Sequence, residues 1–310
     1  MNCYFYETLF HDILKVVIKM SIMTQLEFEL EFSESEKEIA RYILNHGDDV
    51  LSMSVKQLAK QTYTSPATIV RLCKKIGLEG YNDFKIKYSA ELQYDLQRTD
   101  RIDVNFPFDK DDSHPIICHK LASLSQEVIA DTIQLIDFHQ LDKIVDLLYQ
   151  YHDIDIYGSG NSLLAAMSFQ HKMMRIARNI NLKVLHGEQV FMSYNSNPNR
   201  IGMIISYSGE TNELIQVAQT LKEKKTPIIV FTSVGDNRLS HYADYVLNIG
   251  SREKIFTKIA PFASQVSMEY LLNVIFSCIF QKDYEQNIQN KIGYDKKNDS
   301  RHPLSSPVTD

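Results

Sequence analysis

The sequence has few of the residue patterns that build metal centres or disulfide frameworks. Its four cysteines are scattered along 310 residues without a CxxC spacing: Cys3, Cys73, Cys118 and Cys278. Neither a disulfide scaffold nor a zinc site is indicated, and reduced thiols in a cytosol are the expected state. The ten histidines form no HxH or HExxH arrangement. We therefore predict a cytoplasmic protein with no metal and no cofactor.

An excess of positive charge is also absent. The chain has 33 Lys and Arg residues against 39 Asp and Glu residues, which gives a formal net charge of −6. This balance excludes a globally basic nucleic-acid coat, so any DNA binding must come from a local patch. A hydrophobic content of 44% and a charged content of 23% are typical of a soluble globular protein. The length suffices for two domains, each with its own core.

The N-terminus lacks an uninterrupted apolar run. Five polar residues break up its apolar sequence: Glu7, His11, Asp12, Lys15 and Lys19. We therefore predict neither a signal peptide nor a membrane span there. Because periodic, capped sequence begins only after Met23, one hypothesis is that residues 1–23 are an extension ahead of a true translation start at Met20 or Met23.

Periodicity and turn residues divide the remaining chain into four zones. Residues 24–98 have helical periodicity. Residues 99–114 are polar, with Pro107 and an acidic group (Asp109, Asp111 and Asp112), and are predicted to be an interdomain linker. Residues 115–285 alternate between helical segments and short aliphatic runs, whereas residues 286–310 are polar and are predicted to be a disordered tail.

The aliphatic runs of the third zone predict five strands. They span residues 153–157, 182–186, 201–207, 227–232 and 245–249. Each run is rich in Ile and Val, and helical segments separate most of them, which is typical of a parallel sheet covered on both faces. We predict an all-helical N-terminal domain and a C-terminal α-β-α sandwich with a five-stranded parallel sheet. The apolar helix over about 264–280 is expected to pack on this sheet, and a share in a dimer interface stays open.

Three helix starts in the first zone can be identified from capping residues. They are Ser33 with Glu36, Ser54 with Gln57, and Ser65 followed by Pro66. The first two are capping boxes, and the third places proline at the first helical position. The stretch between Gln61 and Ser65 is then a tight turn, so the pattern predicts a helix-turn-helix.

The helix predicted from Pro66 to Ile76 has one apolar and one basic face. Its apolar residues are Ile69, Leu72, Cys73 and Ile76, and its opposite face carries Ala67, Thr68, Arg71, Lys74 and Lys75. Between residues 56 and 87, seven basic residues face two acidic ones, a local charge of +5: Lys56, Lys60, Arg71, Lys74, Lys75, Lys85 and Lys87. A solvated helix with ordinary surface lysines is the alternative, but the turn and the patch together favour DNA reading.

This segment resembles a known family. The sequences "SVKQLAKQT" and "SPATIVRLCKKIGLEGYNDFK" are similar to the helix-turn-helix of the RpiR family of bacterial transcription regulators. The resemblance implies DNA as a partner, in the form of a pseudo-palindromic operator read by paired recognition helices. The residues that we predict to contact DNA are Ser65, Ala67, Thr68, Arg71, Lys74, Lys75 and Lys85.

Two loops of the third zone follow predicted strands and lead into helices. They are "GSGNS" (158–162) and "SYSGET" (206–211). Ligands bind open α/β sheets at this edge, where glycine lets the backbone approach an anion, and N–H groups and hydroxyls donate to it. A GxG alone often only makes a turn, whereas SYSGET brings three hydroxyls within six residues. It therefore predicts a neutral phosphate cradle.

The pair of loops resembles the SIS (sugar isomerase) domain, whose members bind phosphorylated sugars with an SxSGxT loop. The resemblance implies that Ser206, Ser208 and Thr211 hold the phosphate of a phosphorylated sugar. The residues implied from the first loop are Ser159, Asn161 and Ser162. RpiR regulators have this order of domains, so the expected function is a regulator of a carbohydrate operon that acts as a homodimer or homotetramer and binds no membrane.

Two other functions stay open from the sequence. A phosphosugar isomerase needs a general base, and the candidates near these loops are His186, Glu188, Glu210 and Glu253. An enzyme has little use for a fused DNA reader, so we predict no catalytic residue. The third possibility is an effector-blind DNA-binding protein whose SIS domain only dimerises.

Overall fold

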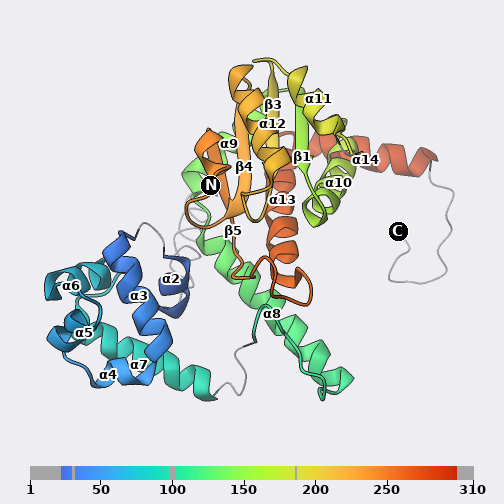
Figure 1. Ribbon diagram of the computed structural model, residues 1–310. Helices are drawn as coiled ribbons and strands as arrows, with labels where there is room; N and C mark the ends of the chain where they lie inside the picture. Colours follow the sequence, from blue (N-terminus) through green and yellow to red (C-terminus); the bar gives the residue numbers. More distant parts are fainter. Residues whose placement is uncertain (1–21, 30–31, 98–101, 186, 299–310) are drawn as a thin grey trace, which may run out of the picture. The chain divides into compact units, whose positions relative to one another are not determined.

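The computed structural model describes residues 22–29, 32–97, 102–185 and 187–298. The chain forms two compact units (Figure 1). The first unit includes residues up to 136, with 233–237 and 248–267, and the second includes residues 137–232, 238–247 and those from 268 onward.

Six helices form the N-terminal part of the first unit among the residues described. They are α2 (Ile22–Phe28), α3 (Glu34–His46), α4 (Asp48–Ser52), α5 (Val55–Gln61), α6 (Pro66–Lys75) and α7 (Tyr81–Gln97). The three predicted helix starts are confirmed. The Ser33 N–H donates to Glu36 Oε2 at 2.9 Å, and Ser54 exchanges bonds with Gln57. Ser65 Oγ accepts the Thr68 N–H at 3.1 Å, with Pro66 at the first helical position.

A single apolar core joins these helices. The predicted apolar face of α6 is buried together with Ile39 of α3 and Leu58 of α5. On α7, Tyr81, Phe84 and Tyr88 stack along one face with ring centroids 5.8 and 5.0 Å apart. Each tyrosine hydroxyl donates to a backbone carbonyl, so these rings are buried without an unpaired polar atom.

The last two residues of the predicted leader, 22 and 23, belong to the first described helix. Ile22 is buried at the start of α2, and its N–H donates to Glu91 Oε1 at 2.8 Å. Met23 N–H donates to the other oxygen of the same carboxylate. The folded domain thus includes residues 22 and 23, and residues 1–21 of the predicted leader lie outside the described residues.

The predicted linker is only partly a free connection. No helix or strand lies between residue 102 and the start of α8 (His114–Gln134) in the described chain. Val104 is nevertheless buried against Leu124 and Val128 of α8. Asn105 accepts the N–H groups of Lys254 and Ile259 at 2.7 and 2.9 Å. The linker is therefore anchored ahead of the acidic group at residues 109–112.

The second unit contains the predicted sheet. Its strands are β1 (Asp153–Gly158), β2 (Ile180–Leu182), β3 (Arg200–Ile205), β4 (Ile228–Ser233) and β5 (Tyr245–Ile249), in the order β2-β1-β3-β4-β5. The five-stranded parallel sheet is as predicted. Its central strands β1, β3 and β4 are buried almost throughout, which requires cover on both faces.

Helices connect the strands and cover them. They are α9 (Phe138–Gln150), α10 (Asn161–Met174), α11 (Glu188–Tyr194), α12 (Asn212–Glu223) and the short η1 (Ser240–Tyr242). α11 lies beside α12 (Figure 1), and α12 buries Leu214, Val217 and Leu221 against Tyr157, Ile204 and Val230. These three strand residues are register neighbours, so they present one row of side chains to α12.

One predicted strand is misplaced. We expected residues 182–186, but β2 ends at Leu182, and Val184 and Leu185 are 56% and 64% exposed. The preceding residues are held instead, because Ile180 is buried and Asn181 Nδ2 donates to Asp155 Oδ1 of β1 at 2.9 Å.

Two helices end the described chain. α13 (Phe262–Lys282) is long and apolar enough to cross a membrane by composition, but it buries Met268, Leu271, Leu272, Ile275 and Ile279 within the protein. This spacing is that of a core helix. The predicted disordered tail is wrong over its first part, because α14 (Tyr284–Asn298) is helical and Asn287 is buried, with Nδ2 donating to Phe280 O at 2.9 Å. Residues 299–310 lie outside the described residues.

Gly250, which follows β5, offers a test of this packing. A Cβ there lies 2.5 Å from Thr132 Oγ1 and 2.9 Å from the Thr132 backbone. We predict that Gly250→Ala lowers the free energy of unfolding by about 1–3 kcal/mol, because backbone atoms must move. Gly293→Ala, on open helix surface, is the control and should leave it unchanged or raise it by up to about 1 kcal/mol. Urea denaturation followed by circular dichroism measures both, and equal values would contradict the packing argument.

Candidate functional site

The exposed face of α6 carries the side chains predicted to contact DNA. Ala67, Arg71, Lys74 and Lys75 are exposed, and Thr68 is half-buried. Ser65 Oγ and Thr68 Oγ1 lie 2.9 Å apart, so these two hydroxyls bond to each other at the start of the helix. The structure therefore brings all of these residues to one surface, where the hydroxyls of Ser65 and Thr68 bond to each other.

Glu36 holds two cations of this face. Its side chain is 2% exposed, and its two carboxylate oxygens accept Arg71 Nε at 3.0 Å and Lys75 Nζ at 2.8 Å. Lys75 also lies 5.8 Å from the Phe32 ring centroid. Glu36 bonds Arg71 only through Nε, and the Arg71 side chain is 64% exposed. The terminal nitrogens of its guanidinium therefore face solvent.

The ionisation of Glu36 reflects these contacts. Burial alone raises the pKa of Glu36, but hydrogen bonds from Lys75, Ser33 and Arg71 outweigh burial and lower the pKa to about 2 from an ordinary 4.5. The capping box made Glu36 visible in the sequence, but its ion pairs span 35 and 39 residues and have no local signal.

Other basic residues of the predicted patch point in different directions. Lys85 is half-buried, with Nζ 3.4 Å from Met53 O and 5.5 Å from the Tyr81 ring centroid, so it faces the protein. Lys87 pairs with Asp83 at 2.8 Å. Lys56 and Lys60 are exposed on α5. Of the cations counted in the sequence, these two and Lys74 are exposed and make no ion pair within the part of the chain that the structure describes.

The two polar loops of the second unit leave neighbouring strands. Gly158 at the end of β1 is the register partner of Ile205 at the end of β3. The loops that follow, 158–162 and 206–211, therefore begin side by side at the carboxyl edge of the sheet and lead into α10 and α12.

The SYSGET loop has a compact hydrogen-bonded form. Ser206 is buried and its N–H donates to Phe231 O at 2.9 Å, which continues the pairing of β3 with β4. Its hydroxyl lies 3.4 Å from Thr211 Oγ1. Ser208 Oγ accepts the Glu210 N–H at 3.2 Å, and Gly209 has φ +66°, a conformation that favours glycine. The three predicted hydroxyls are thus gathered on one turn.

The start of α12 adds backbone donors to this turn. Thr211 is the N-cap residue, but in the described structure its side chain makes no cap hydrogen bond, so it leaves the first N–H groups of the helix uncapped. The loop is fixed on its outer side, because Leu239 N–H donates to Gly209 O at 3.1 Å and Arg238 N–H donates to Glu210 Oε1 at 2.9 Å. This arrangement suits a small anion.

The first loop is held by a glutamine from α11. Gln189 accepts the Gly158 N–H at 3.0 Å and donates to Gly158 O at 2.8 Å. Ser159 is exposed and Asn161, the first residue of α10, is half-buried, but Ser162 is buried with Oγ 3.6 Å from Met268 Sδ. The structure therefore places Ser159 and Asn161 toward the surface and turns the Ser162 hydroxyl toward α13.

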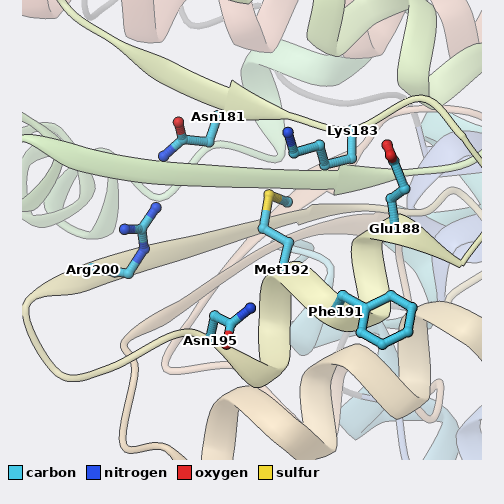
Figure 2. Close-up of a pocket in the computed structure, with 7 residues that line it drawn as sticks. All are labelled: Asn181, Lys183, Glu188, Phe191, Met192, Asn195 and Arg200. Atoms are coloured by element: carbon cyan, nitrogen blue, oxygen red, sulfur yellow. The ribbon is translucent and has the colours of Figure 1, made fainter.

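A separate cavity of about 430 Å³ lies between β2, the start of β3 and α11 (Figure 2). Arg200 donates to both oxygens of the buried Asp155, which also accepts Asn181. Figure 2 shows Asn181 and Arg200 at one end and Lys183 and Glu188 at the other. None of the predicted phosphosugar residues lines this cavity.

The candidate general bases fall into different environments. Glu188 lines the separate cavity, and Glu210 is tied to Arg238. Glu253 is buried, accepts the N–H groups of Ala263 and Ser264 at the start of α13, and pairs with Lys258 at 2.9 Å. Its bonds are those of a helix cap, so both carboxylate oxygens of Glu253 are engaged within the protein. His186 lies outside the described residues.

Within the described residues, no group of three or more His, Cys, Asp or Glu side chains has an arrangement that holds a metal ion.

Two known domain families match the chain. The model described as "Helix-turn-helix domain, rpiR family" matches residues 20–95, and that described as "SIS domain" matches residues 147–276. A protein of Caldanaerobacter subterraneus subsp. tengcongensis, named an uncharacterized HTH-type transcriptional regulator, is 30% identical over 280 residues, covering 90% of this chain and 94% of that protein. The chain belongs to the RpiR family of transcriptional regulators.

Other relatives agree with this RpiR assignment. A Clostridium perfringens protein with the same kind of name is 28% identical over 274 residues, covering 88% of this chain and 97% of that protein. Both resemblances seen in the sequence are confirmed. These relatives are named as regulators and not as enzymes.

Solved structures share the fold of this RpiR protein. The Vibrio vulnificus NanR protein complexed with ManNAc-6P has a TM-score of 0.56 and 24% identity, covering 90% of this chain and 99% of that chain. A putative sugar-phosphate isomerase from Listeria monocytogenes has a TM-score of 0.52 and 20% identity, covering 59% of this chain and 98% of that chain. The fold therefore occurs both in a protein solved with ManNAc-6P and in a protein named as a putative sugar-phosphate isomerase.

The Glu36 contacts predict a pH-dependent stability. Because the pKa of Glu36 is lower in the folded chain, its carboxylate stabilises the fold above about pH 5 and loses this effect as the pH falls toward 2. Glu36→Gln should lower the free energy of unfolding at pH 7 by roughly 2–4 kcal/mol, and the difference from wild type should shrink between pH 5 and pH 2.

Urea denaturation at a series of pH values, followed by circular dichroism, measures this difference. Glu34→Gln is the matched control, since Glu34 is 83% exposed in its pair with Lys37 and its loss should leave stability nearly unchanged at every pH. A deficit of Glu36→Gln that stays constant down to pH 2 would show that the ion pairs do not cause it.

Proposed function

We propose that this RpiR regulator senses a phosphorylated sugar in the cytoplasm and controls a carbohydrate operon. In this proposal the SIS domain binds the effector without catalysis, and the α6 face reads a pseudo-palindromic operator. The single observation that carries the proposal is the gathering of the Ser206, Ser208 and Thr211 hydroxyls at the start of α12.

The chemistry of this turn suits a phosphate ester. Hydroxyls and backbone N–H groups donate to phosphate oxygens, and the helix start favours negative charge without a cationic side chain. Ser159 and Asn161 lie in the loop that follows β1, next to the end of β3. They are proposed to bind the sugar or its phosphate, with Ser162 beside them. The relative NanR was solved with ManNAc-6P, a ligand of the same chemical class.

The DNA-reading surface is proposed to include Ser65, Ala67, Thr68, Arg71, Lys74 and Lys75. Arg71 keeps its terminal nitrogens toward solvent, which suits a bidentate contact to a base edge, and Lys74 suits a phosphate. Lys85, which faces Met53 and Tyr81, must leave those contacts to meet DNA.

A second copy of the chain is proposed to complete the regulator. α10 exposes an apolar stripe, Leu164, Met167 and Met174, at helical spacing. Exposed apolar side chains in a row favour contact with another protein surface. A homodimer or homotetramer joined through SIS domains would present paired α6 helices to two half-sites.

Effector binding is proposed to reach the linker through α13. Ser162 of the first loop touches Met268 of α13, and Glu253 caps the start of the same helix. The next residue, Lys254, bonds to Asn105 of the linker. The effector changes DNA affinity only as far as it binds one arrangement of the dimer more tightly, with about 1.4 kcal/mol per tenfold.

Fluorescence anisotropy tests the regulator directly. The full chain is titrated on labelled DNA from upstream of its own gene, with a panel of hexose and amino-sugar phosphates and their dephosphorylated forms. We expect a salt-dependent complex whose affinity moves about fivefold or more with one phosphosugar and not with the free sugar. DNA binding that ignores the whole panel would favour an effector-blind protein, and turnover of a phosphosugar seen by NMR without DNA binding would favour an isomerase.

Serine variants test the phosphate cradle. Ser206→Ala and Ser208→Ala should each weaken binding of the responsive phosphosugar by roughly 10- to 100-fold, because each removes a donor to a charged oxygen. Ser168→Ala, an exposed serine of α10, is the matched control and should bind as wild type. Isothermal titration calorimetry measures all three, and unchanged affinity in the Ser206/Ser208 double variant would refute the cradle.

A further inference from the structure

The turn between α5 and α6 holds an unusual residue. Tyr63 is 98% exposed, and its φ is +52°, in the left-handed region that disfavours residues other than glycine. Among the described residues only three other non-glycine residues have a positive φ: Glu29, Ala177 and Lys225. A large aromatic side chain in this conformation, with no surface to pack on, costs the folded state free energy.

The backbone of the turn explains the conformation but not the side chain. Thr64 N–H donates to Ala59 O at 2.9 Å, and Tyr63 N–H donates to Lys60 O at 3.4 Å. These bonds close the end of α5 in the pattern that places a left-handed residue just after a helix, where glycine is the usual choice. Glycine would meet the same need without the cost, so the fold does not require a tyrosine here.

The other hydroxyls of the turn are used within it. Thr62 Oγ1 donates to Leu58 O at 3.0 Å and lies 2.9 Å from Thr64 Oγ1. Ser65 Oγ caps α6. The Tyr63 hydroxyl, by contrast, bonds no atom in the part of the chain that the structure describes. The turn therefore presents one large side chain with a polar tip and no partner in the protein.

The place of this side chain points to its partner. The turn connects the two helices of the helix-turn-helix, directly before the start of α6 and next to the exposed Lys60. In this motif the second helix enters the major groove and the first crosses the DNA backbone, so a side chain between them meets the strand at the groove edge. Tyrosine hydroxyls are among the donors that bind phosphate oxygens there.

We propose that Tyr63 contacts the DNA backbone, with its hydroxyl donating to a phosphate oxygen and its ring lying against the deoxyribose. This inference rests on the proposed DNA-binding function. A backbone contact carries no base information, and a neutral phenol releases no counterion. Tyr63 therefore contributes equally to operator and unrelated DNA and leaves the salt dependence unchanged.

The test uses the full chain with two variants and one control. Tyr63→Gly removes the side chain and relieves the backbone, and Tyr63→Phe removes only the hydroxyl. Ala177→Gly relieves the same strain (φ +57°) at an exposed position in the SIS domain. Anisotropy is measured on the upstream duplex and on an unrelated duplex of equal length, at several salt concentrations, and melting is followed by circular dichroism.

We expect Tyr63→Gly to melt about 2–4 °C higher and yet to bind both duplexes at least tenfold more weakly, with Tyr63→Phe losing about tenfold. The salt slope should not change. Ala177→Gly should melt higher and bind as wild type, which separates strain relief from DNA contact.

Three results would overturn the inference. If Tyr63→Gly binds DNA as tightly as wild type, Tyr63 makes no contact with the DNA backbone, and the proposed function still stands. A loss confined to the upstream duplex would mean base reading instead of a backbone contact. Wild type that binds neither duplex would end the proposed function, and the inference with it.

Discussion

The carboxylate of Glu36 fixes two of the cations on the exposed face of α6, and the position of that helix depends on it. The same side chain caps α3 and binds Arg71 and Lys75 of α6, so the start of one helix and the exposed face of another are fixed by one group. Because Glu36 is buried, these pairs are screened less than surface pairs, and they hold side chains that are otherwise mobile. Glu36 reduces the net positive charge of this face. In exchange, its hydrogen bond to Nε holds the guanidinium of Arg71 in one orientation.

The two candidate sites handle anions by different physical means. The α6 surface relies on full charges, which suit a polyanion that must be found at long range. The SYSGET turn relies on hydroxyls, N–H groups and a helix start, without a cation in the turn itself. A neutral cradle discriminates by shape and hydrogen-bond geometry, which suits the small phosphate ester of the proposed function.

Much of the architecture follows from local chemistry and was predictable. Ser33, Ser54 and Ser65 marked helix starts because caps act within four residues, and the strands β1, β3, β4 and β5 were visible as short aliphatic runs. The errors have two causes. The position of β2 depends on a contact distant in sequence, because Asn181 donates to Asp155, 26 residues away. The helix α14 was missed because its sequence is polar, although Asn287 is held by Phe280 O only seven residues away. The turn hydroxyls of the candidate site were visible in sequence, whereas the partners of Arg71 and the left-handed φ of Tyr63 were not.

The continuity of α13 has a mechanical consequence. Its capped start and its contact with the first loop, at Ser264 and Met268, are four residues apart, about 6 Å along a single rigid rod. The backbone hydrogen bonds of this one turn join the residue that Glu253 caps to the residue that Ser162 contacts, so a local change at either position acts on the same turn of helix.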